Sequence, residues 1–173
     1  MLPGLPRIGQ LLNYNAYGDQ LDDLIYSPIE LARLLRPFNA VSQVLAETQI
    51  VETLRTAYQE DKHAAGDLQA TWQSEQAQIY VLPDKPWARR ISGNFANQLK
   101  REYPNSSIAI LSHKPAGYQV SIRSAHPELY PAMTFAKSFA SGGGRAAAAG
   151  INFLPASDYE LFSRQFIEYF GQH

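Results

Sequence analysis

Strand-like and helix-like patterns alternate through the second half of the chain. Short apolar runs at 79–82 and 107–111 predict buried strands, and residues 118–123 alternate between apolar and polar with a period of two. A further strand is expected at 150–154. Helical patterns fill the intervals. Such interleaving predicts an α/β fold, with a small mixed β-sheet flanked by helices.

Three helices are expected around these strands. One starts at Asp84 and carries an apolar stripe, a second covers 128–139, and a third follows a capping box formed by Ser157 and Glu160. The apolar stripe of the third helix is expected to face the core and consists of Tyr159, Phe162, Phe166 and Phe170.

The first 74 residues read as a helical extension. Ser27 and Pro28 predict a helix start, and that helix should end before Pro37. A longer helix is expected from 39 to 58, followed by a frayed helix end or linker over 61–76. We therefore expect two parts: residues 1–74, helical, and residues 75–173, an α/β domain.

Composition excludes several classes of protein. The 173 residues include no cysteine, which excludes a disulfide framework and thiolate chemistry. No apolar run is long enough for a membrane helix, and no secretory signal precedes the first helix, so a cytoplasmic protein is expected. Residues 1–74 carry five basic and nine acidic groups, whereas residues 75–173 carry ten and seven. The resulting charge of +3 on the second part suits a phosphate-bearing ligand but is too small for a duplex-DNA binder.

The run Ser141-Gly142-Gly143-Gly144-Arg145 is the strongest candidate for a binding site. Consecutive glycines leave backbone N–H groups unscreened, and such a loop can form a concave nest for an anion. The arginine that follows adds a permanent charge and a forked set of donors suited to phosphate.

Three segments in order resemble the C-terminal, DHH-associated substrate domain of the DHH phosphoesterase family. They are Ser-Gly-Asn-Phe-Ala-Asn-Gln-Leu at 92–99, Val-Ser-Ile-Arg-Ser at 120–124 and the glycine run with its alanines at 142–150. The resemblance spans about residues 78–170. It implies a small α/β domain that closes over a catalytic domain and holds a short nucleotide or single-stranded oligonucleotide, or its terminal phosphate.

The resemblance also implies candidate ligand contacts in this chain. The phosphate-binding candidates are Arg123, Ser124, Gly142, Gly143, Gly144 and Arg145, and the candidate cleft residues are Asn94, Asn97 and Arg90. Arg145 stands where the family usually has histidine, so a phosphate contact is kept but a titrating group is not. A structural ion pair remains an alternative role for Arg123. For Arg90 and its neighbour Arg89, the alternatives are a solvated helix face or a salt bridge.

The catalytic residues of that family have no counterpart here. The family holds two divalent metals, manganese among them, with clustered aspartates and a consecutive Asp-His-His, whereas His63, His113, His126 and His173 each stand alone. Asp22 is the best candidate for a last metal-binding aspartate, but one carboxylate cannot hold two metals. We therefore expect a truncated protein that lacks the catalytic half, contains no catalytic residue, metal site or cofactor of its own, and is inactive alone.

Two other functions remain open at this point. Arg145 to Gly150 partly matches the loop of acyltransferases that receives the pyrophosphate of coenzyme A at a helix N-terminus. Alanine stands where that loop needs glycine, and the residues that follow read as strand. The other alternative is a folding or dimerisation module without a ligand. The oligomeric state is not predicted.

Overall fold

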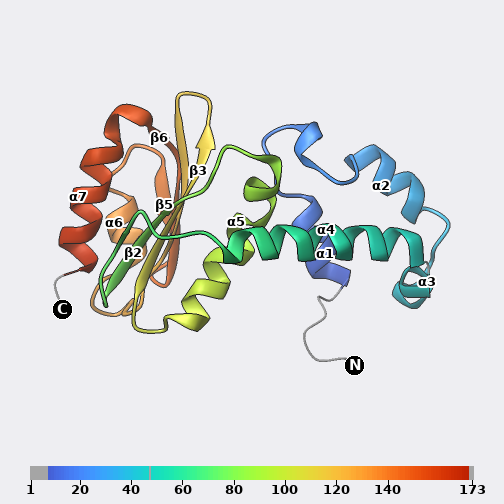
Figure 1. Ribbon diagram of the computed structural model, residues 1–173, viewed down its shortest axis with the longest axis horizontal. Coiled ribbons are helices and arrows are strands. Elements are labelled where there is room, and N and C mark those ends of the chain that lie inside the picture. The colour runs from blue at the N-terminus through green and yellow to red at the C-terminus, as the bar shows by residue number, and fades with distance from the viewer. Residues whose placement is uncertain (1–7, 47, 172–173) are drawn as a thin grey trace. The chain divides into compact units, whose positions relative to one another are not determined.

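The computed structural model describes residues 8–46 and 48–171, apart from the side chains of 46 and 48 (Figure 1). The chain divides into two compact units. Unit 1 comprises Met1–Asp67 and Lys85–Ile91, and unit 2 comprises Leu68–Asp84 and Ser92–His173. Helix α5 (Pro86–Glu102) gives its first residues to unit 1 and the remainder to unit 2. The opening residues before Ile8 and the terminal His173, named in the sequence predictions, lie outside the described residues.

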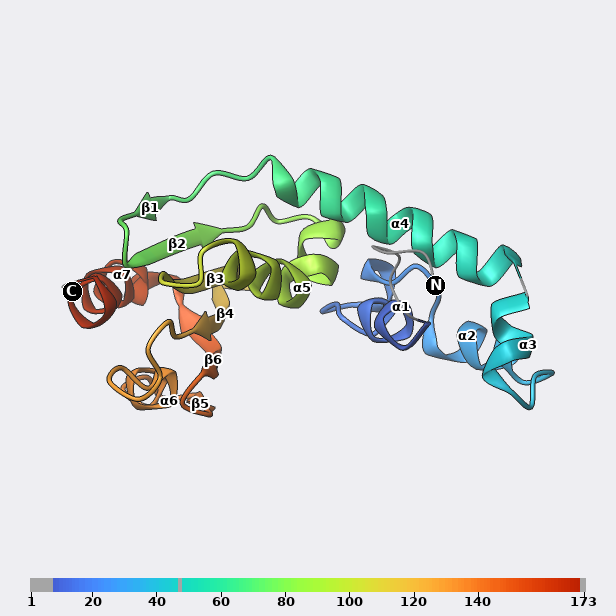
Figure 2. The same ribbon diagram turned by 90° about the horizontal axis from the view of Figure 1, so that it is seen from below.

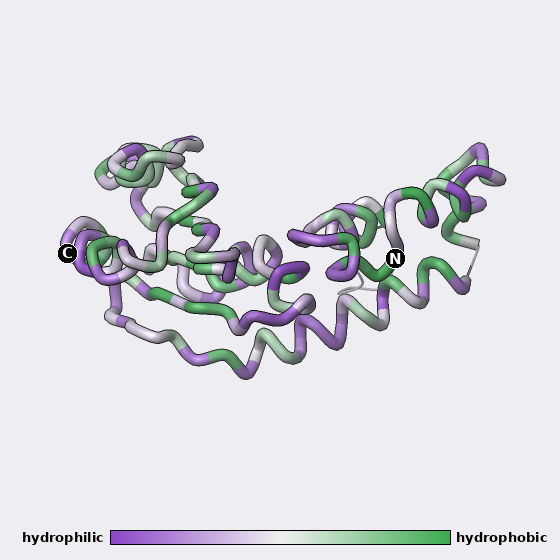
Figure 3. Tube along the Cα trace, turned by 90° about the horizontal axis from the view of Figure 1, so that it is seen from above, coloured by the Kyte–Doolittle hydropathy of each residue, from purple (hydrophilic) through white to green (hydrophobic). Residues whose placement is uncertain are grey.

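Unit 1 is helical. Its elements are α1 (Ile8–Asn15), the short 3₁₀ helix η1 (Leu21–Asp23), α2 (Pro28–Leu35), α3 (Val41–Ala46) and α4 (Thr48–Gly66). Green and purple alternate along α4 in Figure 3, as expected for a helix with one apolar side. That side packs on α1 through a small core of Leu11, Ile50, Val51 and Leu54.

The start of α2 confirms the sequence prediction, whereas the following segment differs from it. The Ser27 hydroxyl accepts the Glu30 N–H at 3.2 Å, with Pro28 in the first helical position. The single helix predicted over 39–58 corresponds to α3 and α4. The predicted frayed end or linker at 61–76 was wrong in part, because α4 continues to Gly66 and strand β1 (Trp72–Gln73) follows. Asp61 is buried, which explains why a polar stretch stays helical.

Unit 2 is built on one six-stranded sheet with the order β1-β2-β3-β4-β6-β5. Besides β1, its strands are β2 (Ala77–Val81), β3 (Ser107–Lys114), β4 (Gly117–Arg123), β5 (Gly142–Gly144) and β6 (Ala148–Pro155). β2 and β3 pair in parallel and the other neighbours pair antiparallel. The predicted mixed α/β fold with helices before it is confirmed. Figure 2 shows β1 alongside β2 and β5 beside α6.

The two faces of this sheet differ in what covers them (Figure 1). Helices α6 (Ala132–Ala136) and α7 (Tyr159–Phe170) pack on one face and form the core with Val120 and Ile122 of β4. Ser121 and Arg123 point to the opposite face, because side chains alternate along a strand. We call this the α5 face, since Phe95 of α5 contacts Tyr80 of β2 edge-on, with ring centroids 5.4 Å apart.

Three sequence predictions in unit 2 need correction. The helix predicted over 128–139 shrinks to α6, because Pro131 disfavours a helical conformation in the residue before it. The predicted glycine loop is the edge strand β5, which pairs with β6. The predicted capping box does not form: η2 (Ala156–Asp158) precedes α7, and the Ser157 hydroxyl donates to Asp158. The predicted core side of α7 is confirmed for Phe162, Phe166 and Phe170.

Candidate functional site

Arg123 and Arg145 lie in one register row across three strands. Arg123 at the end of β4 is paired with Ala148 of β6. Ala148 in turn exchanges two backbone hydrogen bonds with Arg145, at 2.8 Å and 3.2 Å, closing the hairpin between β5 and β6. Directly opposed residues of antiparallel strands project on the same face. Both arginines therefore belong to the α5 face, with Cα atoms about 10 Å apart at two strand spacings.

Asn97 holds the Arg123 side chain. The Nε–H of Arg123 donates to Asn97 Oδ1 at 3.1 Å, and an Nη1–H donates to the Ile122 carbonyl at 3.0 Å. Arg123 is half-buried and Asn97 exposed, while Asn94, one turn earlier on α5, is half-buried. Two candidates from distant segments, Arg123 and Asn97, are thus in direct contact.

The three glycines of β5 serve different purposes. A Cβ on Gly142 would lie 1.7 Å from the Ala136 carbonyl oxygen, so the close approach of α6 requires glycine there. Gly144 has a φ of 142°, and its Cβ would lie 2.5 Å from the Cα of Ala149. Nothing lies within 4 Å of a Cβ on Gly143, which pairs with Gly150. Packing therefore explains two of the glycines and leaves Gly143 as open backbone on the α5 face.

Ser124 links the loop after Arg123 to neighbouring backbone. Its side chain is buried, and its hydroxyl donates to the Tyr130 carbonyl at 2.7 Å. Its backbone N–H donates to the carbonyl of Ala147 in the β5–β6 hairpin turn, at 3.1 Å. These bonds hold the loop after Arg123 against the turn after Arg145.

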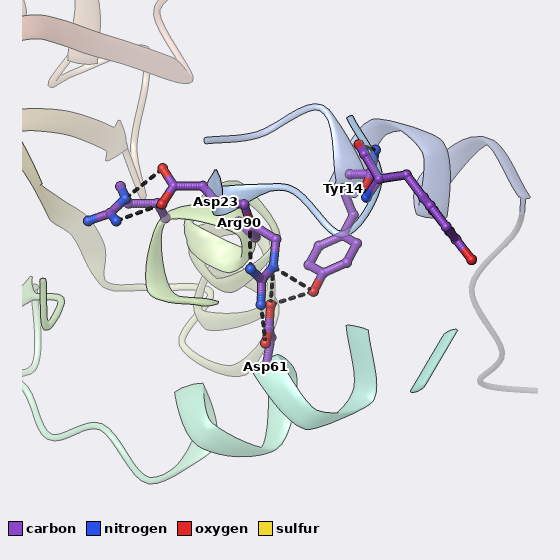
Figure 4. Close-up of polar contacts among 7 residues, drawn as sticks. Tyr14, Asp23, Asp61 and Arg90 are labelled. Carbon is purple, nitrogen blue, oxygen red and sulfur yellow. Dashed lines mark hydrogen bonds and ion pairs between the residues drawn. The ribbon is translucent and has the colours of Figure 1, made fainter. Parts of the chain in front are cut away.

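Arg90 lies in a buried network of unit 1 (Figure 4). Its guanidinium donates to both oxygens of Asp61, at 2.8 Å and 3.0 Å, and to the Asp23 carbonyl at 2.6 Å. The Tyr14 hydroxyl also donates to Asp61. The guanidinium thus has structural partners within unit 1, as in the salt-bridge alternative, and the cleft role expected for Arg90 stays a prediction.

This network shifts the pKa values of Tyr14 and Arg90. Burial, together with the hydrogen bond to Asp61, raises the pKa of Tyr14 well above its ordinary value. Burial alone would lower the pKa of Arg90, but Asp61 and Tyr14 outweigh it and the pKa is raised. The neighbouring Arg89 holds Asp23 with bonds of 2.9 Å and 2.6 Å and lowers the pKa of that carboxyl to about 2, aided by the N–H groups of Asp19 and Gln20.

The sequence singled out Asp22, whereas Asp23 and Asp61 are the buried carboxylates that pair with Arg89 and Arg90. Asp22 is exposed. Within 8–46 and 48–171, no group of three or more histidine, aspartate or glutamate side chains could hold a metal ion. The residues present therefore do not fit the two-metal centre that the family resemblance implies, and no chemical step is assigned to a metal here.

Two further findings bear on the predictions. Arg145 to Gly150 forms a β-hairpin and continues into β6, so it does not open a helix, and the acyltransferase alternative is not favoured. No helix in the part of the chain that the structure describes combines the length and apolarity needed to cross a bilayer.

Sequence reasoning missed the partners of two arginines in unit 1 and one exposed aromatic side chain in unit 2. Asp23 and Asp61 lie 66 and 29 residues from Arg89 and Arg90, respectively, and no local pattern links them.

Phe153 was expected only as part of a strand, yet its side chain is 43% exposed. Ile151 and Leu154 are three positions apart, so both cannot face the core of a regular strand with a period of two. This spacing is the signal that could have identified Phe153.

Comparison with known proteins gives a consistent family and fold. The model of the DHHA1 domain matches residues 75–172. The structure of RecJ from Thermus thermophilus in complex with Mn²⁺ is similar over 94% of this chain and 23% of its own, with a TM-score of 0.65 and 16% identity. A manganese-bound exonuclease RecJ is similar over 96% of this chain and 40% of its own, with a TM-score of 0.57 and 16% identity. No curated protein matches the chain. The chain thus spans less than half the length of either RecJ structure, and likeness at this identity establishes the fold alone.

Proposed function

Since the chain belongs to the DHHA1 domain family of DHH phosphoesterases, we propose that it is the nucleotide-binding part of a metal-dependent phosphodiesterase. Its ligand is a short nucleotide or a single-stranded oligonucleotide. The chain does not break bonds by itself. Hydrolysis, with its divalent metals, belongs to a catalytic DHH domain that these residues do not supply. On this proposal, residues 1–74 are the tail of that catalytic domain with its connecting helices, and residues 75–173 are the substrate-binding domain.

The register row of Arg145, Ala148 and Arg123 carries this proposal. Arg123 and Arg145 flank Ala148, a residue with almost no side chain, one from β4 and the other from the position after β5. Gly143 and Gly150 continue the bare floor in the next row. A phosphate on this surface meets two permanent charges and forked donors without any bulk between them. The floor is a strand surface rather than the concave nest expected from the sequence.

The other candidate residues support this surface. Asn97 orients Arg123 through the bond to its Nε–H. Ser124 fixes the loop that follows Arg123 against the β5–β6 turn, so its role is to position rather than to touch the ligand. Asn94 is one helical turn from Asn97 and faces the same surface.

Calorimetric titration with a 5′-phosphorylated dinucleotide tests the proposal. Arg123→Ala and Arg145→Ala should each weaken binding by about 1–3 kcal/mol, the size of a charge-assisted hydrogen bond. The matched control is Arg164→Ala, which removes an arginine from α7 on the opposite face and should leave the affinity unchanged. Equal affinity of both site variants and the wild type would refute the assignment.

A further inference from the structure

A β-bulge turns Phe153 out of the core onto the α5 face. Val120 pairs with Ile151 and Tyr118 with Leu154, so Gln119 alone faces both Asn152 and Phe153. Ile151 and Leu154 are fully buried, whereas Asn152 and Phe153 are exposed. The extra residue therefore allows both flanking side chains to stay in the core while the two between them face outward.

The Phe153 ring lies against Gly117 of β4. A Cβ on Gly117 would lie 2.9 Å from Phe153 Cε2, so the ring lies against the bare backbone of Gly117. Gly117 shares the strand parity of Ser121 and Arg123 on the regular strand β4. The ring is consequently on the same face as the two arginines.

Ser141, the residue before the glycine strand, braces the bulge. Its hydroxyl accepts the Phe153 N–H at 2.8 Å and donates to the Phe153 carbonyl at 2.9 Å. Its carbonyl accepts the Asn152 N–H at 3.2 Å. A single exposed phenylalanine is ordinary on protein surfaces. This one is held in a fixed backbone conformation, which reduces the entropy that a ligand contact would cost.

The spacing along β6 relates the ring to the arginine row. Phe153 lies five positions after Ala148 on β6, a distance of about 15 Å along a strand. Between them the α5 face presents Gly150 and the outward-facing Asn152 and, on the neighbouring strand, Gly143. A phosphate at the arginine row and an aromatic ring farther along the same surface match the two chemical parts of a nucleotide chain, anionic backbone and flat base.

We propose that Phe153 is a stacking platform for an unpaired nucleobase of the bound oligonucleotide. This rests on the proposed function, since the arginine row must first hold a phosphate. Because the separation exceeds the size of one mononucleotide, the stacked base belongs to the second or a later nucleotide. Stacking on a phenylalanine ring is tolerant of base identity, so this contact selects for length and single-strandedness rather than sequence.

Calorimetry on the full chain with two probes tests the proposal. The probes are a series of 5′-phosphorylated oligoadenylates of two to four nucleotides and adenosine 5′-monophosphate. Phe153→Ala should weaken binding of the best oligoadenylate about 5- to 150-fold, as expected for loss of one base–aromatic stack. It should leave the affinity for the monophosphate unchanged. Phe153→Trp should retain the oligoadenylate affinity, and Leu161→Ala, which removes another partly exposed apolar side chain, is the control.

The outcomes separate the two proposals. If the wild type binds neither probe, the phosphate site and the stacking role both fail. If the wild type binds both probes and Phe153→Ala weakens neither, or weakens both equally, the stacking role is refuted while the phosphate site stands. If Phe153→Ala changes the mass measured by light scattering without changing oligoadenylate affinity, Phe153 is a contact between proteins, which also refutes it. Thermal unfolding of each variant checks that the bulge substitution leaves the fold intact.

Discussion

Arg90 and Asp61 form a two-pronged ion pair inside unit 1, with Nε–Oδ2 and Nη2–Oδ1 distances of 2.8 Å and 3.0 Å. Both side chains are nearly buried, at 11% and 6% exposure. The pair joins α4 to the first turns of α5, and the Tyr14 hydroxyl adds α1 to the same carboxylate. Three helices of unit 1 are thereby fixed at one point (Figure 4).

Removing one side of this pair should be costly. Arg90→Ala leaves the Asp61 carboxylate buried without its main partner, and breaking a buried pair from one side costs about 3–5 kcal/mol. We expect a loss of this size in the free energy of unfolding, measured by urea denaturation. Arg33→Ala, an exposed arginine on α2, is the matched control and should change it by less than about 1 kcal/mol. A loss for Arg90→Ala no larger than the control's would show that the network does not stabilise unit 1.

Asp23 should make stability depend on acid pH. Arg89 lowers the pKa of this carboxyl from 3.8 to about 2, so the ionised form is favoured in the folded state. Its contribution is therefore complete above about pH 4 and is lost as the pH falls towards about 2. Asp23→Asn should be less stable than the wild type near neutral pH, and the difference in melting temperature should shrink as the pH falls through that window. A constant difference across that range would exclude the linkage.

The fold class could be predicted because its signals are local. Residues 118–123 alternate with period two, and the predicted core face of the last helix is the one observed for Phe162, Phe166 and Phe170. Pairing register is not a local property. Arg123 and Arg145 share one row because β6 lies between β4 and β5. The sequence pattern of neither segment predicts this strand order.

Other parts of the candidate site could not be predicted for the same reason. The glycine run reads as a loop until β6 supplies partners for its backbone, after which it is an edge strand. The contact between Arg123 and Asn97 joins residues 26 apart, and the buried partners of Arg90 are at least as distant along the chain. Family resemblance identified the arginines and glycines as candidates, but only the tertiary structure separates Ser124 and Arg90 from the exposed surface.

The purified chain should lack phosphodiesterase activity. Two-metal hydrolysis requires several converging ligands, and the described residues contain no cluster of three that could hold an ion. We expect no manganese-stimulated release of p-nitrophenol from bis-p-nitrophenyl phosphate above that of a boiled sample. Metal-dependent turnover that persists through repeated purification, and that disappears on addition of EDTA, would contradict the assignment of catalysis to a separate DHH domain.

Gly143 and Gly144 are neighbours whose substitution by alanine should have opposite consequences. Gly144→Ala forces a side chain into a backbone with φ of 142° and a Cβ 2.5 Å from Ala149, so it should lower the free energy of unfolding by more than about 1 kcal/mol. Gly143→Ala meets open space and should leave stability within about 0.5 kcal/mol. If phosphate binds over the bare floor, however, the new methyl group at 143 should weaken dinucleotide binding several-fold. Urea denaturation and calorimetry on the two variants separate these effects, and unchanged affinity in a folded Gly143→Ala protein would mean that the ligand does not approach this strand.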